Sequence, residues 1–167
     1  MRLVYTRTST LGAALIRAMP PWGPWSHCAT VWGDDVIEAV AVPPGHNLLL
    51  ALLRDEGRVI RRPLADLLAG SSAWMLCDLD VPREDLGYAY AVSRIGHKYD
   101  HGGVLAVPTR VRPWADDERD YCSEALLDTT AASLRELRYP GMHGATPTQC
   151  AHLTHAAGHR VIGAGEN

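Results

Sequence analysis

The chain has 167 residues, of which 47% are apolar. This length suffices for one well-filled core but not for two ordinary domains, so we expect a single domain over residues 1–167. The formal net charge is −3, and no block of Lys and Arg exceeds a pair such as Arg61-Arg62. Because phosphate backbones are bound by continuous basic surfaces, this pattern argues against nucleic acid as a partner. Neither the apolar core of a signal peptide nor a run of about 18 apolar residues is present, so we expect cytoplasmic synthesis and no stable membrane insertion.

The first part of the sequence predicts a strand, a helix and a hairpin. A strand at residues 3–6 is followed by a helix that Ser9 or Thr10 opens and that Pro20-Pro21 stops. Residues that favour strands lie on both sides of the tight turn Gly33-Asp34-Asp35 and predict a hairpin. The expected strands of the hairpin span residues 25–32 and 36–42, and a further short strand is expected at 58–62.

The middle of the sequence predicts two helices and one strand. Pro63 in a first turn favours a helix at residues 63–68, and an apolar run favours a strand at 73–79. Pro82 opens a further helix, which we expect to end near Gly96.

The last part of the sequence predicts one long helix. Residues 116–120 form an acidic stretch that we expect to face solvent, and a helix is expected from Cys122 to about Leu134. The remaining sequence is rich in Gly and His and indicates no clear element. We expect residues 163–167 to form a loose tail.

Cys122 is the candidate nucleophile. It stands where a loop turns into a helix, and a helix N-terminus lowers the pKa of a thiol. Only the thiolate attacks well, so a Cys in this position is suited to form an acyl-thioester. The four cysteines show no CxxC spacing, which argues against a disulfide framework or a zinc ribbon, and we expect Cys28 and Cys77 to pack in the core.

His27 and Glu38 are the candidate partners of this thiol. They lie on the two strands of the hairpin, where their side chains can lie side by side on one face. The carboxylate would then fix the tautomer and orientation of an imidazole that acts first as base and then as acid. A thiol, an imidazole and a carboxylate are the parts of a cysteine hydrolase, provided that folding joins them at a mouth open to solvent.

Three segments of the sequence resemble the permuted papain-like amidases and cysteine peptidases of the YaeF/YiiX type, which are related to NlpC-type cell-wall hydrolases. The resemblance implies an α+β, circularly permuted papain-like fold in which a helix bearing Cys122 packs on a small antiparallel sheet bearing His27 and Glu38. The segments are Trp25-Ser26-His27 with Val36-Ile37-Glu38-Ala39, Gly96-His97-Lys98-Tyr99-Asp100, and Tyr121-Cys122-Ser123-Glu124-Ala125-Leu126.

The resemblance also implies which side chains surround the thiol. Tyr99 is similar to a tyrosine that lies beside the nucleophile in NlpC-type enzymes, and Trp25, Ser26 and Tyr121 adjoin the implied catalytic residues. We take these four residues as candidates for binding substrate or supporting the site. The oxyanion hole would use the backbone N–H of Cys122 and a second donor that the sequence does not identify.

The spacing of the histidines raises the alternative of a metal site. His152, His155 and His159 fall at i, i+3 and i+7, and His97 and His101 fall at i and i+4. No acidic ligand has a matching spacing, a glycine interrupts the first group, and a Gly- and Asp-containing loop carries the second. We therefore expect no metal ion and no other cofactor.

These observations predict a thiol hydrolase of amide bonds that acts on a small peptide or an acyl-amide. The resemblance leaves two substrate classes open, peptidoglycan stem peptides and N-acyl or lipid amides; the first would suit a bacterial or phage protein exported by another route. Two alternatives also stay open: a non-catalytic papain-like scaffold associated with a phage or a secretion system, and an acyltransferase that uses the same three residues. The oligomeric state stays open as well.

Overall fold

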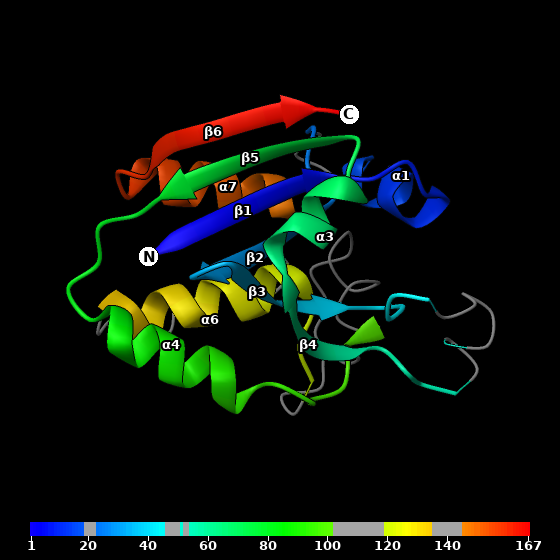
Figure 1. Cartoon of the computed structure of the whole chain (residues 1–167), viewed down its shortest axis with the longest axis horizontal. Coiled ribbons are helices and arrows are strands. Elements are labelled where there is room, and N and C mark those ends of the chain that lie inside the picture. The colour runs from blue at the N-terminus through cyan, green and yellow to red at the C-terminus, as the bar shows by residue number, and fades with distance from the viewer. Residues whose placement is uncertain (19–22, 46–50, 52–53, 102–118, 135–144) are drawn as a thin grey trace.

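A six-stranded sheet in the order β4-β3-β2-β1-β5-β6 forms the centre of the fold, and all neighbouring strands are antiparallel (Figure 1). The computed structural model describes residues 1–18, 23–45, 51, 54–101, 119–134 and 145–167. The strands are β1 (Arg2–Arg7), β2 (His27–Trp32), β3 (Asp35–Val40), β4 (Arg58–Pro63), β5 (Ala73–Asp78) and β6 (Arg160–Glu166).

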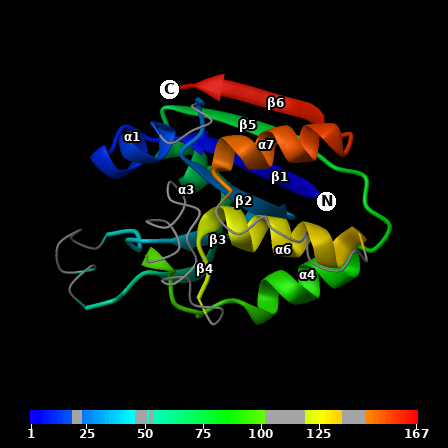
Figure 2. The same ribbon diagram turned by 180° about the vertical axis from the view of Figure 1, so that it is seen from behind.

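Helices cover both faces of this sheet. α6 (Cys122–Leu134) and α7 (Pro147–Ala156) lie on the face that Figure 2 turns toward the reader, and α4 (Glu84–Ser93) packs beside α6. The short helix α3 (Leu64–Ala69) lies on the other face, and α1 (Leu11–Arg17) lies beyond the end of β1. The chain is therefore an α+β protein. None of its described helices is both long and apolar enough to cross a membrane.

The alternation of side chains along β1 divides the core between the two faces. Leu3 and Tyr5 pack with Leu126 on the face that α6 and α7 cover. Val4 points the other way and packs with Leu67 of α3. Each of these side chains is almost fully buried, and such burial stabilises the fold by about 1.5–3 kcal/mol for a large aliphatic side chain.

Local sequence signals explain where several elements begin. The hydroxyl of Thr10 accepts a hydrogen bond from the backbone N–H of Ala13 at 3.2 Å at the start of α1. Gly33 has a φ of +62° in the turn between β2 and β3, a conformation that glycine adopts without strain. Thr146 and Gln149 form a capping box at the start of α7. The elements expected before the C-terminal third are confirmed, with small differences at their ends, whereas α7 was not predicted despite this capping signal.

The prediction of a loose C-terminal tail is wrong. β6 pairs along β5, and its Gly163 and Gly165 lie against the indole of Trp74. A Cβ added to Gly165 would approach Trp74 to 2.8 Å, so this contact requires glycine. Asn167 then donates two side-chain hydrogen bonds of 2.8 Å to backbone carbonyls near the end of α3. The strand was missed because its glycines interrupt the apolar alternation by which strands are recognised.

Candidate active site

Cys122 is the first residue of α6, and the segment before it is held by a short bridge. Tyr99 and Asp120 pair in this bridge. The Asp120 N–H donates to the carbonyl of Lys98 at 3.0 Å, and the Asp100 N–H donates to the carbonyl of Asp120 at 3.0 Å. The thiol therefore stands at a fixed helix N-terminus, where the first backbone N–H groups have no partner within the helix.

Asp120 does not face solvent as we expected. It is 1% exposed, and Arg94, the C-cap residue of α4, donates to its carboxylate from Nε at 2.8 Å. Burial raises the pKa of Asp120, and the charge and hydrogen bond of Arg94 oppose this effect. The prediction failed because the compensating arginine comes from a distant helix that packs beside α6. Residues 116–118 of the same acidic stretch lie outside the described part of the chain.

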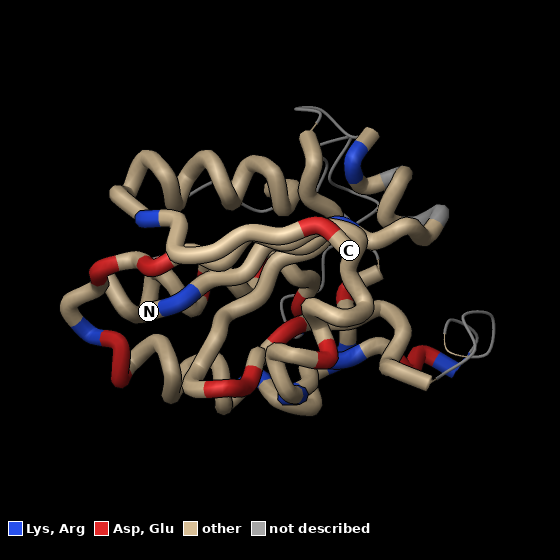
Figure 3. The backbone as a smooth tube through the Cα atoms, turned by 45° about the horizontal axis from the view of Figure 1, so that its top comes forward, with Lys and Arg blue, Asp and Glu red and all other residues tan. Residues whose placement is uncertain are grey.

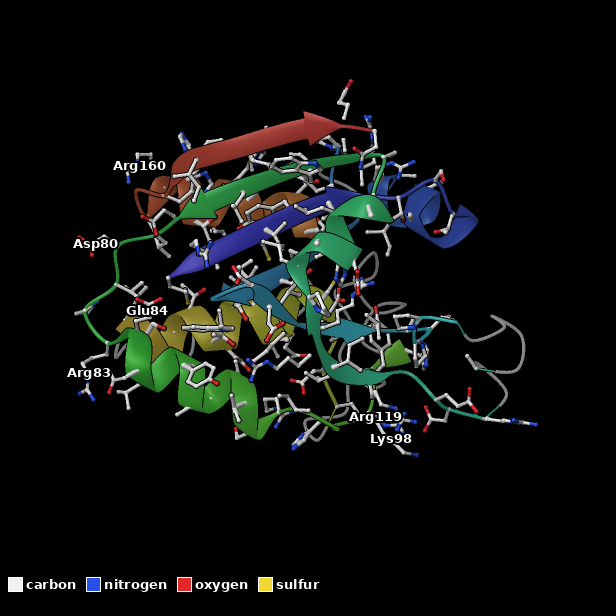
Figure 4. All side chains as sticks on the ribbon, viewed as in Figure 1. Asp80, Arg83, Glu84, Lys98, Arg119 and Arg160 are labelled. Atoms are coloured by element: carbon white, nitrogen blue, oxygen red, sulfur yellow. The ribbon has the colours of Figure 1, made fainter. Side chains whose placement is uncertain are left out.

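A charge cluster supports the same region from the outside. Lys98 and Arg119 lie near one another (Figure 4), and both pair with Asp55, at 2.7 and 3.1 Å. Elsewhere in the described chain, basic and acidic residues are interspersed (Figure 3). These ion pairs therefore connect the turn before β4, which carries Asp55, to the segment that leads into α6, which carries Arg119.

The hairpin brings His27 and Glu38 together as predicted. Thr30 pairs with Ile37 in the register of β2 and β3, and continuing this register sets Glu38 diagonally across from His27 on the same face. The Nε2 atom of His27 lies 2.5 Å from Oε2 of Glu38. The carboxylate thus fixes the orientation of the imidazole through its Nε2 atom.

Glu38 is the innermost member of this group. Its side chain is 0% exposed, and Arg62 of β4 donates from Nε to Oε1. Burial acts to raise the pKa of Glu38, but the hydrogen bond and charge of His27, together with Arg62, lower it below its usual value. The carboxylate is therefore ionised at neutral pH. Arg62 was not among the predicted site residues.

The imidazole of His27 and the thiol of Cys122 each shift the pKa of the other. Burial by itself lowers the pKa of His27, but the interactions with Cys122 and Glu38 raise it to about 10. His27 therefore bonds Glu38 and interacts with Cys122, so the three predicted catalytic side chains meet in one place. Cys122 is 4% exposed and the His27 side chain 17%, so the sulfur itself does not lie at an open mouth and the exposed part of the pair is the imidazole.

Cys28 takes part in the same network, although we expected only core packing from it. It is 0% exposed and packs in the same core cluster as Cys122 and Cys150. The interaction with Cys28, followed by that with His27, lowers the pKa of Cys122 well below its usual value against the opposing effect of burial. A thiolate and imidazolium pair is the state that these shifts favour at neutral pH.

The four predicted supporting residues have different surroundings. Tyr99 is 5% exposed, and its ring lies against that of His101 with centroids 5.0 Å apart and planes tilted by 54°. Ser26 accepts from the N–H of Thr8 at 3.1 Å, so its hydroxyl has a structural partner. Tyr121 is buried in the cluster that contains Tyr99, and Trp25 packs on the cluster that contains Cys122.

Comparisons with known proteins show a likeness of fold. No protein-family model and no curated protein sequence matches the chain. Among solved structures it is similar to the metalloprotein YiiX of Escherichia coli O157:H7, with a TM-score of 0.52 and 15% sequence identity. The match covers 82% of this chain and 66% of YiiX, so the chain spans somewhat less than two thirds of that protein. The YiiX-like fold is thus supported, whereas permutation of a papain-like core remains a proposal.

The two histidine groups have other contacts. His159 pairs through Nδ1 with the hydroxyl of Thr154 at 2.7 Å, and this hydroxyl also bonds Tyr5 at 2.7 Å. His155 lies beside His159, with ring centroids 5.3 Å apart. Within the described residues, no group of three or more His, Cys, Asp and Glu side chains is arranged to hold a metal ion.

Replacing Cys28 with Ala should make Cys122 less acidic. A hydrogen bond to a charged group is worth about 1.5–3 kcal/mol, so its loss should raise the pKa of Cys122 by about one unit or more. The midpoint of iodoacetamide alkylation of Cys122 against pH measures this shift. Cys77→Ala is the matched control, because Cys77 is equally buried and its pKa is raised to about 11 by burial alone. Equal midpoints in the two variants would refute the role of Cys28.

Proposed function

We propose that the chain is a cysteine hydrolase of amide bonds with a circularly permuted papain-like fold. The meeting of Cys122, His27 and Glu38 at the start of a helix supports the proposal, because a thiol, an imidazole and a carboxylate are the groups that an acyl-thioester mechanism needs. Each comes from a different element, α6, β2 and β3.

The first half of the reaction forms a thioester. The Cys122 thiolate attacks the carbonyl carbon of the substrate amide, and the negative charge that develops on the oxygen is met by the N–H groups at the start of α6. The His27 imidazolium then gives its proton to the leaving amine as the carbon–nitrogen bond breaks. Glu38 stabilises the imidazolium and keeps its ring in place.

The second half of the reaction releases the acid. Neutral His27 takes a proton from a water molecule, the resulting hydroxide attacks the thioester carbon, and the bond to sulfur breaks. The products are a carboxylic acid and the regenerated thiolate and imidazolium pair. YiiX is described as a metalloprotein, whereas each step proposed here uses only the side chains and backbone of this chain.

Selective labelling and trapping test this proposal. Iodoacetamide at neutral pH is expected to label Cys122 much faster than Cys28, Cys77 and Cys150, which mass spectrometry after digestion measures. Incubation with stem-peptide and N-acyl amide panels should then yield an acyl adduct on Cys122 that is absent in Cys122→Ala. Free acid as the product indicates a hydrolase, and acyl transfer to an added amine or alcohol indicates the acyltransferase. Uniform labelling without an adduct would favour the scaffold and refute catalysis.

A further inference from the structure

Arg62 completes the set of hydrogen bonds around the Glu38 carboxylate. One oxygen of Glu38 bonds His27, and the other accepts from Nε of Arg62. The Glu38 side chain is 0% exposed and that of Arg62 is 23% exposed, so the pair joins the buried carboxylate to the surface. A buried carboxylate needs such partners, because desolvation otherwise favours its neutral form.

The strand register explains why Arg62 reaches this carboxylate. β3 lies between β2 and β4, and Val36 pairs with Arg62 while Glu38 pairs with Ile60. Arg62 is thus diagonal to Glu38 from one side, as His27 is from the other. Because the two partners occupy different oxygens, Arg62 limits rotation of the carboxylate away from His27.

We propose that Arg62 is a positioning residue of the site, which holds the Glu38 carboxylate in the orientation that its bond with His27 requires. This inference rests on the proposed function, since it assigns Arg62 a part in the same site. Arg62 touches neither the thiol nor a substrate in this scheme and acts only through Glu38. The planar guanidinium suits this role because it offers donors in a fixed geometry.

The other charged groups near Glu38 have different partners. Arg94, the C-cap residue of α4, lines a cavity of about 10 Å³ beside Glu38 but is bonded to Asp120. Arg61, the neighbour of Arg62 on β4, pairs with Asp35 at 2.6 Å on the opposite face of the strand. His27 from β2 and Arg62 from β4 both lower the pKa of Glu38 against the effect of burial.

The test measures the pH dependence of Cys122 alkylation by iodoacetamide in the full chain. Arg62→Gln is expected to move the acid-side midpoint up by about one pH unit, so that alkylation below it is about tenfold slower. The reason is that a less firmly held Glu38 stabilises the imidazolium less, and a weaker imidazolium raises the pKa of the thiol. Arg62→Lys keeps the charge but not the fork of donors, so its midpoint should lie between those of Arg62→Gln and the unaltered protein.

Two comparisons separate positioning from a general structural effect. Arg61→Gln, one residue away on the same strand, should keep the midpoint of the unaltered protein. In a Glu38→Gln background, Arg62→Gln should add no further shift, because Arg62 acts through Glu38. An additive shift, or equal midpoints in Arg62→Gln and Arg61→Gln, would overturn the proposal. Should Arg62→Gln fail to fold, Arg62→Lys and Arg61→Lys give the same comparison. A shift of the midpoint is expected in Arg62→Lys alone. Equal midpoints in the two variants would refute the role of Arg62.

The design also distinguishes failure of the inference from failure of the proposed function. If Cys122 of the unaltered protein is alkylated no faster than the other cysteines, both proposals fail together. If Cys122 is selectively reactive, but its midpoint does not respond to Arg62→Gln, the role of Arg62 alone is wrong.

Discussion

Replacing His27 with Ala should slow alkylation of Cys122 at pH 7 by roughly 30-fold, because a thiol with the usual pKa of about 8.5 is only a few per cent ionised at that pH. In the folded protein, Cys28 and His27 lower the pKa of Cys122, so the thiolate is favoured at neutral pH. The proposed amide hydrolysis should fall further, by about 10³-fold, because the proposed general acid is lost as well. Stopped alkylation reactions analysed by mass spectrometry, together with product assays, measure the two effects.

The effect of His27→Ala on the reactivity of Cys122 should depend on pH. The lowered pKa of Cys122 keeps the sulfur reactive on the acid side of neutrality, whereas His27→Ala should confine its reactivity to alkaline pH. His155→Ala serves as the control, since His155 is an exposed residue of α7. A His27→Ala protein that is alkylated at the original rate at pH 7 would show that the imidazole does not activate the thiol.

The three central residues were predictable because each has a local signature. His27 and Glu38 are held by one hairpin, so a short stretch of sequence specifies both their strands and their register. Cys122 begins a helix whose start is visible in the sequence. The meeting of the hairpin and the helix came only from the resemblance to a known family, because nothing in local periodicity specifies which distant elements pack together.

Arg62 and the effect of Cys28 on Cys122 were missed for a related reason. Arg62 bonds Glu38 only because β4 pairs with β3 in one particular register, and β4 follows a long connection instead of a tight turn. Cys28 was expected to turn away from His27, and along the strand it does lie on the α6 face. Because this face also carries the nucleophile, Cys28 packs in the same core cluster as Cys122 and lowers its pKa.

The environment of Cys122 also limits the chemistry that the site supports. The sulfur is buried in a cluster with Leu126 and Cys150, while the His27 side chain retains 17% exposure. The exposed part of the pair is therefore the imidazole. Low dielectric around the thiolate strengthens its attraction to the imidazolium, which is consistent with a pair that persists over a wide pH range.

Arg94→Met should lower the free energy of unfolding by about 3–5 kcal/mol at pH 7. The reason is that the substitution leaves the buried charge of Asp120 without its main partner. Asp120 is 1% exposed and its carboxylate lies 2.7 Å from Nη2 of Arg94. Thermal and urea unfolding measure the loss. Arg83→Met is the control, because Arg83 pairs with Asp85 at the exposed start of α4 and should change stability little.

The loss in Arg94→Met should depend on pH in a defined direction. Burial already raises the pKa of Asp120, and removal of Arg94 should raise it further. A carboxyl group whose pKa is higher in the folded than in the unfolded protein binds its proton more tightly when folded, so stability falls as pH rises from the unfolded pKa to the folded one. The variant should therefore approach the unaltered protein in stability below about pH 4 and differ most at neutral pH. A difference that is constant over this range would mean that Arg94 stabilises α4 and α6 by packing and not by compensating the charge of Asp120.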